Sequence, residues 1–518
     1  MKIEKLFYQI DKFLVKYPNS KIWIFLFLSI TFILIGAGLL SYKENISIAL
    51  WDSWTYFADP GTHVEVNGTY LRSVSVFITI LGMVFFALLI GLISEAVENK
   101  VEALKEGKTK VYEENHIVII GFSLQTITII KQLQYTNQKI VLLSNYSKQE
   151  IEDILLSYNI KDVICRNGEI DNIFYLDKVN IKKAKSVIIV ANDDGLNMKL
   201  ILLLTKKLHL KIPITIEIQD EKYQKSLNLL EKDYPNLNFI YTKQSLARLL
   251  ALSAIYIGVG QTYDKLFDYT GDSFYLIDDK CFFNKNILEI AKMINKRLIG
   301  IYSDFSHCLI IDTNYKYQQN DKILILSDNN KFKIVENKYI SKQIKFKELK
   351  NEEIYLIGEN EKKEFILDEF KNRNVKLDKN SDTLVVIGKD DNEVISNLIL
   401  LKQNYANIFA EVYSTDLVSI LSHNDINDYI ISTELVAKLL VSVSFSNEMN
   451  LIINDLLSKG GNIMYIIQIQ KEMDYVELYF SLLSQNIALI GVIEENIINL
   501  HPKKLLKNQK LIVISNKG

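Results

Sequence analysis

A short polar turn near the N-terminus places one carboxylate between two long apolar stretches. It follows an aromatic segment, Ile46 to Phe57, whose composition suits a short helix. Proline and glycine then stop that helix abruptly. Non-helical backbone enters a membrane only where protein or water covers its polar groups, as in selectivity filters. A ring of carboxylates, one from each subunit, favours cations. The turn therefore predicts a cation filter formed by Ala58, Asp59, Pro60, Gly61, Thr62 and His63.

Two other interpretations of this segment stay open. Aspartate beside proline and glycine commonly caps a local turn through its side chain, which gives Asp59 a purely structural alternative. The whole segment can also rest at the membrane interface with Trp51 and Trp54 as aromatic anchors. The break between a short helix and a second apolar stretch favours the filter, because a simple membrane anchor does not need it.

A Rossmann-like unit is predicted after residue 115. An apolar strand, His116 to Gly121, ends in a glycine turn, and a helical stretch then leads to the strand Lys139 to Ser144. Further strands follow at Asp162 to Arg166, Ser186 to Asn192 and Pro213 to Ile218, separated by helical segments. This order predicts a doubly wound parallel sheet.

The dinucleotide fingerprint of such a sheet is degraded here. Where G-x-G-x-x-G is expected, the chain has Gly121, Ser123 and Thr126, and no acidic residue follows the second strand to bind a ribose hydroxyl. Ligands of parallel sheets nevertheless bind beyond the carboxyl ends of the strands. The sequence therefore predicts a regulatory pocket at Gly121, Ser123, Arg166, Asn192, Asp193 and Asp194, with solvated loop ends as the alternative for each.

Several other chemistries find no support in the residue types. The six histidines are scattered, and none shares a motif with a serine, a cysteine or a carboxylate, so no enzyme is predicted. The three cysteines match no metal spacing and no disulfide framework. Lysine and arginine number 60 against 62 aspartates and glutamates, which gives no general attraction to nucleic acid.

The two apolar stretches predict membrane-spanning helices. No charged residue interrupts Ile22 to Tyr42 or Ser73 to Ser94, and at about 1.5 Å per residue each covers a hydrocarbon core of about 30 Å. Lysines cluster before the first span and after the second, whereas only Lys43 and Arg72 lie between the spans. The positive-inside rule therefore predicts a multi-pass protein of the cell membrane with both termini in the cytosol.

The cytosolic region contains an internal repeat. The run DTLVVIGKDDNEVISNLILLK resembles SVIIVANDDGLNMKLILLLTK, and the strands NIFAEVYS and PITIEIQD follow them in turn. The predicted organisation has seven parts: a cytosolic N-terminus (1–21), two spans (22–42 and 73–94) around a pore helix and filter (46–63), a linker (95–115), and two Rossmann-like domains (116–345 and 346–518).

Three segments resemble the CASTOR and POLLUX family of ion channels, and the resemblance covers nearly the whole chain. They are Phe57 to His63, the run CRNGEI with the later KAKSVIIVANDD, and Ile431 to Leu457. The resemblance implies a homotetramer whose cytosolic ring is made of paired RCK domains, the Rossmann-like regulators of potassium conductance. With only two spans, the chain is similar to the shorter bacterial relatives.

The resemblance leaves the ion and the ligand open. Pro60 and Thr62 depart from the family's filter, and the potassium-type TVGYG strand is absent. The family suggests calcium as a regulatory ligand and the Rossmann-like sheet suggests a nucleotide, but no residue pattern assigns a site to either. The leading hypothesis is a cation channel that passes potassium or a wider set of cations, and the alternative is a non-conducting, membrane-anchored nucleotide or redox sensor.

Overall fold

The structure, a computed structural model, describes residues 20–62, 66–191, 193–219, 221–336, 341–401, 404–422, 426–457, 460–494, 497–500, 504–505 and 508–516. The predicted filter residue His63 and the predicted pocket residue Asn192 lie outside the described residues. The chain divides into two compact units, residues 1–105 and 106–518.

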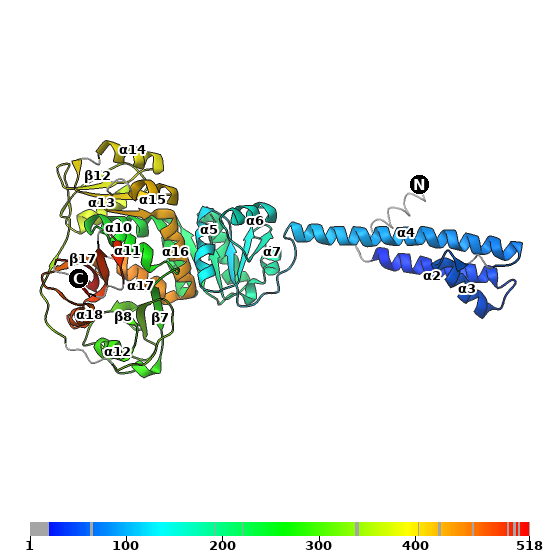
Figure 1. Cartoon of the computed structure of the whole chain (residues 1–518), viewed down its shortest axis with the longest axis horizontal. Coiled ribbons are helices and arrows are strands. Elements are labelled where there is room, and N and C mark those ends of the chain that lie inside the picture. The colour runs from blue at the N-terminus through cyan, green and yellow to red at the C-terminus, as the bar shows by residue number, and fades with distance from the viewer. Residues whose placement is uncertain are drawn as a thin grey trace. The chain divides into compact units, whose positions relative to one another are not determined.

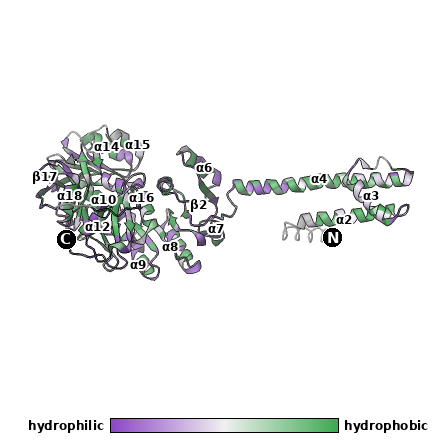
Figure 2. Cartoon of the chain, turned by 60° about the horizontal axis from the view of Figure 1, so that its bottom comes forward, coloured by the Kyte–Doolittle hydropathy of each residue, from purple (hydrophilic) through white to green (hydrophobic). Residues whose placement is uncertain are grey.

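The described residues of the first unit form the helices α2 (Ser20–Leu40), α3 (Ile46–Ala58) and α4 (Thr69–Lys105) (Figure 1). Helices α2 and α4 are both long and apolar enough to cross a membrane. Figure 2 shows hydrophobic residues along α2 and the neighbouring part of α4, and more hydrophilic ones toward the Lys105 end of α4. The predicted spans and the predicted short helix between them thus correspond to helices of the structure.

Small residues bring α3 close to its neighbours. A Cβ atom added at Gly82 of α4 would lie 2.0 Å from the carbonyl oxygen of Phe57, and one added at Gly36 of α2 would lie 2.5 Å from the Ser53 hydroxyl. The fully buried Ser53 hydroxyl donates a hydrogen bond of 2.7 Å to the Ile33 carbonyl. Glycine and serine at helix contacts permit such approach in a bilayer, so α3 is held against both apolar helices.

The second unit begins with a parallel six-stranded sheet of order β3-β2-β1-β4-β5-β6, in agreement with the doubly wound parallel sheet predicted from the sequence. The strands are mostly buried, because helices cover both faces. In chain order the elements are β1 (Ile117–Ile120), α5 (Leu124–Tyr135), β2 (Ile140–Ser144), α6 (Lys148–Ser157), β3 (Val163–Asn167), α7 (Ile173–Lys178), β4 (Ser186–Ile189), α8 (Asp194–Leu202), β5 (Ile214–Ile218), α9 (Gln224–Asp233), β6 (Leu237–Tyr241) and α10 (Thr242–Ile255).

A small antiparallel sheet of order β7-β10-β8-β9 follows this first parallel sheet. Its elements are α11 (Val259–Leu266), β7 (Ser273–Ile277), α12 (Ile287–Met293), β8 (Arg297–Ser303), β9 (Cys308–Ile310) and β10 (Lys322–Ser327). Short helical turns lie at Ile181–Lys183, Leu203–Lys207, Glu221–Tyr223 and Lys280–Phe282.

The second half of the unit repeats this plan. A parallel sheet of order β13-β12-β14-β15-β16 precedes an antiparallel sheet of order β11-β17-β22-β19-β20, and a two-stranded sheet pairs β18 with β21. The elements are β11 (Phe346–Glu348), β12 (Glu353–Ile357), α13 (Lys363–Asn372), β13 (Lys376–Leu377), β14 (Thr383–Val386), α14 (Asp391–Leu401), β15 (Asn407–Val412), α15 (Thr415–Ser422), β16 (Asp428–Ile431), α16 (Ser432–Phe445), α17 (Asn447–Leu457), β17 (Asn462–Ile469), β18 (Met473–Asp474), α18 (Tyr475–Leu483), β19 (Ala488–Glu494), β20 (Ile497–Asn499), β21 (Lys504–Leu505) and β22 (Lys510–Asn516).

Two helices cross from one half to the other. Helix α10 follows the first parallel sheet but packs on α13 of the second half. Helix α16 follows the second parallel sheet but packs on α5, β4 and β5 of the first half (Figure 1). Both helices are buried over most of their length, and a single hydrophobic core contains side chains of both halves. The two halves therefore form one packed body.

The turn after the first strand of each parallel sheet requires glycine. Gly121 and Gly358 both have φ of 97°. A Cβ atom at Gly358 would lie 1.8 Å from the Ile387 carbonyl oxygen, and one at Gly121 would lie 2.3 Å from the Val190 carbonyl oxygen. Any side chain at either position therefore strains the backbone and meets a carbonyl just after the end of the neighbouring strand, β4 or β14.

We expect Gly358→Ala to lower the free energy of unfolding by about 1–3 kcal/mol from backbone strain alone. Gly271→Ala is the matched control, because a Cβ atom there meets nothing within 4 Å. Thermal unfolding of both variants measures the difference. Equal stability of the two variants would show that the turn relaxes without cost.

Candidate functional site

The predicted filter turn closes the C-terminal end of α3. Ala58 is the last residue of the helix, and the Asp59 N–H donates to the Thr55 carbonyl at 2.8 Å. The Asp59 side chain accepts the Gly61 N–H at 2.8 Å, and the Thr62 hydroxyl donates to the Asp59 carbonyl at 2.9 Å. The capping role considered for Asp59 is thus present within one chain. Its role in a pore stays a prediction.

Four residues of the predicted regulatory pocket lie at the carboxyl ends of the neighbouring strands β1 and β4. Gly121 forms the turn after β1, and the Ser123 N–H donates to the Thr126 hydroxyl at 2.9 Å at the start of α5. Asp193 accepts the Gly195 N–H at 2.9 Å, and Asp194 accepts the Gln219 N–H at 3.1 Å. The structure therefore brings these four together at one sheet edge, where their described contacts shape loops and helix starts.

Arg166 lies elsewhere, on the edge strand β3. Its Nε donates to the Thr109 carbonyl at 2.7 Å, and its Nη1 donates to the Cys165 carbonyl at 2.8 Å. Burial lowers the pKa of its guanidinium. Since Thr109 belongs to the segment that leads into β1, the described contacts of Arg166 fasten this incoming segment to the sheet.

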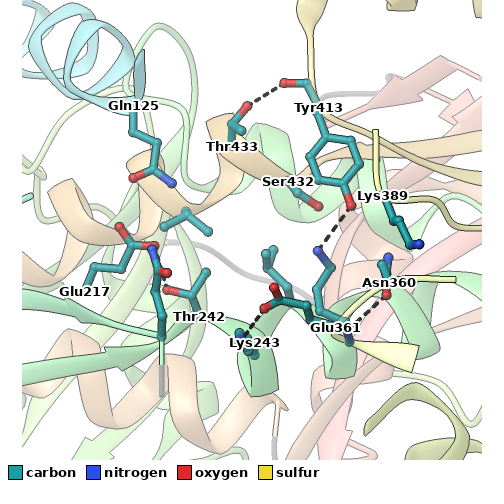
Figure 3. Close-up of a pocket in the computed structure, with 14 residues that line it drawn as sticks. Gln125, Glu217, Thr242, Lys243, Asn360, Glu361, Lys389, Tyr413, Ser432 and Thr433 are labelled. Atoms are coloured by element: carbon teal, nitrogen blue, oxygen red, sulfur yellow. Dashed lines mark hydrogen bonds and ion pairs between the residues drawn. The ribbon is translucent and has the colours of Figure 1, made fainter. Parts of the chain in front are cut away.

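A cavity of about 310 Å³ lies where the carboxyl ends of the two parallel sheets face each other (Figure 3). It is lined from the first half by Gln125, Glu217, Gln219, Thr242, Lys243 and Leu246, and from the second half by Asn360, Glu361, Lys362, Lys389, Tyr413, Ser432, Thr433 and Val436. Of the six residues predicted from the sequence, none of the five that the structure describes lines it. The cavity lies beyond the carboxyl ends of the strands, where ligands of parallel sheets bind, but its lining residues differ from the described residues that the sequence predicts.

The second half contributes a buried ion pair to the cavity. Glu411 on β15 is fully buried, and its carboxylate lies 2.8 Å from the Lys362 ammonium. The Asn360 amide donates to it at 2.7 Å, and the Ser432 hydroxyl donates to it as well. Burial is the largest single influence and acts to lower the pKa of Lys362, but the charge and hydrogen-bond contributions of Glu411 and Tyr413 together outweigh it, so this pKa lies above its usual value. The negative charge of Glu411 is thereby compensated inside the protein by Lys362 and by two hydrogen-bond donors.

The first half contributes a similar carboxylate with neutral partners. Glu217 on β5 is 5% exposed and accepts the Thr242 hydroxyl at 2.9 Å. The Gln125 side chain also hydrogen-bonds to it. Burial raises the pKa of Glu217, and these hydrogen bonds act in the opposite direction. No lysine or arginine pairs with Glu217 within the part of the chain that the structure describes.

Charged side chains also lie around the mouth of the cavity. Lys243 of the first half forms an ion pair with Glu361 of the second half, which joins the two halves directly (Figure 3). Lys389 is exposed, and among the described residues its ammonium has no ion-pair partner. The cavity thus presents acidic and basic groups from two repeats of one fold.

A sequence signal for this site exists in the repeat. The strands β5 and β15 are buried, and each contains one charged residue, a glutamate that takes the same place in the runs PITIEIQD and NIFAEVYS. A buried charge at an equivalent place in two copies points to a constrained environment. Which residues face it depends on the packing of the two halves, which no local pattern gives.

Comparison with known proteins agrees with the predicted resemblance. Residues 117–234 match the TrkA-N domain. The chain is 29% identical over 357 residues to the probable ion channel SYM8 of Pisum sativum, and 30% identical over 351 residues to the ion channel DMI1 of Medicago truncatula. It is 28% identical over 352 residues to the ion channel CASTOR of Lotus japonicus. Each match covers 63% of this chain but only 39%, 39% and 41% of the relative, so the chain spans about two fifths of their length.

Among solved structures, the chain is similar to a GsuK channel bound to NAD, with 13% identity and a TM-score of 0.46 over 96% of this chain and 97% of that one. The sequence relatives are named as ion channels and not as enzymes, in agreement with the expectation of no enzyme. The resemblance of this chain to the CASTOR and POLLUX family of ion channels is therefore confirmed, and most of its first Rossmann-like sheet lies in a TrkA-N domain.

Proposed function

We propose that the chain is a subunit of a tetrameric cation channel gated by its cytosolic region. Helix α3 and the turn after it form a re-entrant pore element between α2 and α4, and residues 116–345 and 346–518 act as paired RCK domains. The observation that carries the proposal is the short helix α3, which is packed against both apolar helices and stops at Asp59 and Pro60. A simple anchor has no need of such an element, and the relatives named as ion channels support the same reading.

Fourfold assembly follows from the number of pore elements. Two spans and one loop cannot enclose a pore, whereas closed cyclic assemblies of identical subunits are the usual solution. We expect the purified protein to have the mass of a tetramer in nanodiscs and to carry cation current in a lipid bilayer under ion gradients. A stable monomer or dimer that conducts would contradict the tetramer. A tetramer that never conducts would favour the membrane-anchored sensor.

The segment from Glu95 to Glu114 is proposed to transmit force from the cytosolic region to the pore. Helix α4 runs to Lys105, and the following residues are held on the first sheet through hydrogen bonds such as that of Arg166 with Thr109. We expect a flexible Gly-Ser insertion after Lys105 to remove the dependence of open probability on the gating ligand, while the open-pore conductance is unchanged. The same insertion after Phe305, in an exposed hairpin turn, is the control. Single-channel recordings in which ligand dependence survives the first insertion would argue against force transmission.

A further inference from the structure

The two sides of the cavity are copies of one arrangement. Each contains a buried glutamate, Glu217 or Glu411, that accepts a hydroxyl from the first residue of the following crossing helix, Thr242 or Ser432. In each half, this glutamate is also contacted by the side chain of the residue four positions after the glycine with positive φ, which is Gly121 or Gly358. The copies differ at this last residue.

That residue is Lys362 in the second half and Gln125 in the first. The charge of Glu411 is balanced by Lys362 at 2.8 Å, whereas the described partners of Glu217 are neutral donors. A buried carboxylate is costly unless an opposite charge or several hydrogen bonds compensate it. The first half therefore has no lysine in the place that Lys362 takes in the second half. The carboxylate that this leaves without a cationic partner among the described residues, Glu217, lies on the wall of the cavity.

The chemistry around Glu217 suits an organic cation better than a metal ion. Calcium takes six to eight oxygen ligands, commonly several carboxylates. Among the described residues no group of three His, Cys, Asp or Glu side chains is placed to hold a metal ion. An ammonium group has three N–H donors. Glu217, Gln125 and Gln219 line the cavity, and their side chains carry one carboxylate and two amide oxygens, which are acceptors for three such donors.

The other side of the cavity offers a cation to a ligand. Lys389 lies across the cavity from Glu217 (Figure 3). It is exposed and without an ion-pair partner in the described chain, whereas Lys243 is engaged by Glu361 and Lys362 by Glu411. A volume of about 310 Å³ lies at the lower end of the range of small-molecule sites. The charge pattern is that of a receptor for a small molecule with one positive and one negative end.

We propose that this cavity binds a small zwitterion of the amino-acid type, whose ammonium group is received by Glu217 and whose carboxylate is received by Lys389. Such a ligand contacts both halves at once, and it supplies from outside the positive charge that Lys362 supplies within the second half. The proposal concerns binding to the cytosolic region and holds whether or not the chain conducts ions.

Calorimetric titration of the full-length chain in nanodiscs tests the proposal. The probes are the twenty common amino acids, one at a time, with ethylamine and propionate as analogues that each lack one charge. We expect at least one amino acid to bind saturably, and both analogues to bind more than tenfold more weakly than it. Saturable binding of none of the twenty overturns the proposal, and so does a Glu217-dependent site that is filled by Ca²⁺ alone.

Variants of the chain decide which groups bind. Gln125→Lys copies the second half and places a lysine beside Glu217, so we expect binding to fall at least tenfold without loss of folding. Lys389→Gln, at an exposed position, is expected to weaken binding about tenfold, because one charge contact is worth about a factor of ten. Lys206→Gln, an exposed lysine outside the cavity lining, is the control. Binding that Gln125→Lys and Lys389→Gln both leave unchanged would overturn the assignment.

Discussion

Replacing Lys362 with methionine is expected to lower the free energy of unfolding by about 3–5 kcal/mol. The carboxylate of Glu411 is fully buried and loses its only charged partner among the described residues, while the hydrogen bonds from Asn360 and Ser432 remain. Methionine keeps most of the lysine stem, so the loss of packing is small. Breaking a buried ion pair is costly because the remaining charge stays in the protein interior, which solvates ions poorly.

Lys243→Met provides the matched control in the same cavity. Its ion pair with Glu361 is at the surface, with side-chain exposures of 33% and 75%. Exposed pairs contribute about 0–1 kcal/mol, so we expect a small effect. Thermal unfolding of the purified chain, read at the transition of residues 106–518, compares the two variants. A Lys362→Met protein as stable as Lys243→Met would mean that water reaches Glu411.

Asp59→Asn is expected to reduce cation conductance several-fold or to alter selectivity in a protein that still folds. Asparagine retains a side-chain oxygen that can accept the Gly61 N–H, so the turn observed after α3 is preserved while the charge is lost. In a tetramer the change removes four carboxylates from the outer end of the pore, and rings of carboxylates favour cations. Single-channel conductance and reversal potentials under ion gradients measure the effect.

Two further substitutions separate charge from shape at this turn. Asp59→Ala removes both the charge and the cap, and Asp52→Asn removes a carboxylate from the middle of α3. A filter role predicts that Asp52→Asn leaves current unchanged and that Asp59→Asn approaches the effect of Asp59→Ala. Tetramers of the Asp59→Asn variant that conduct and select like the parent would limit Asp59 to its role as a turn cap.

Local patterns predict the individual elements of this chain well. The apolar runs that predict strands at Lys139 to Ser144 and Pro213 to Ile218 coincide with β2 and β5 within one residue. These strands lie inside a parallel sheet covered on both faces, and a continuous apolar run is what such burial requires. The short helix before Asp59 is also predicted locally, because proline and glycine end it.

The cavity needs information that local patterns do not contain. Lys243 and Glu361 are more than a hundred residues apart in the chain and meet only because the two parallel sheets face each other. The sequence predicts Arg166 at a ligand pocket because it ends a strand, but β3 is the edge strand and its guanidinium reaches the incoming segment instead. Strand order and the packing of the halves decide both outcomes.

The packing of α10 and α16 makes each half of the second unit dependent on the other. A chain that stopped near residue 345 would expose the face of α5, β4 and β5 that α16 covers, and a chain that began there would leave α13 without α10. Each half alone would therefore expose an apolar face to water, and we expect neither residues 106–345 nor residues 346–518 to fold stably without the other half.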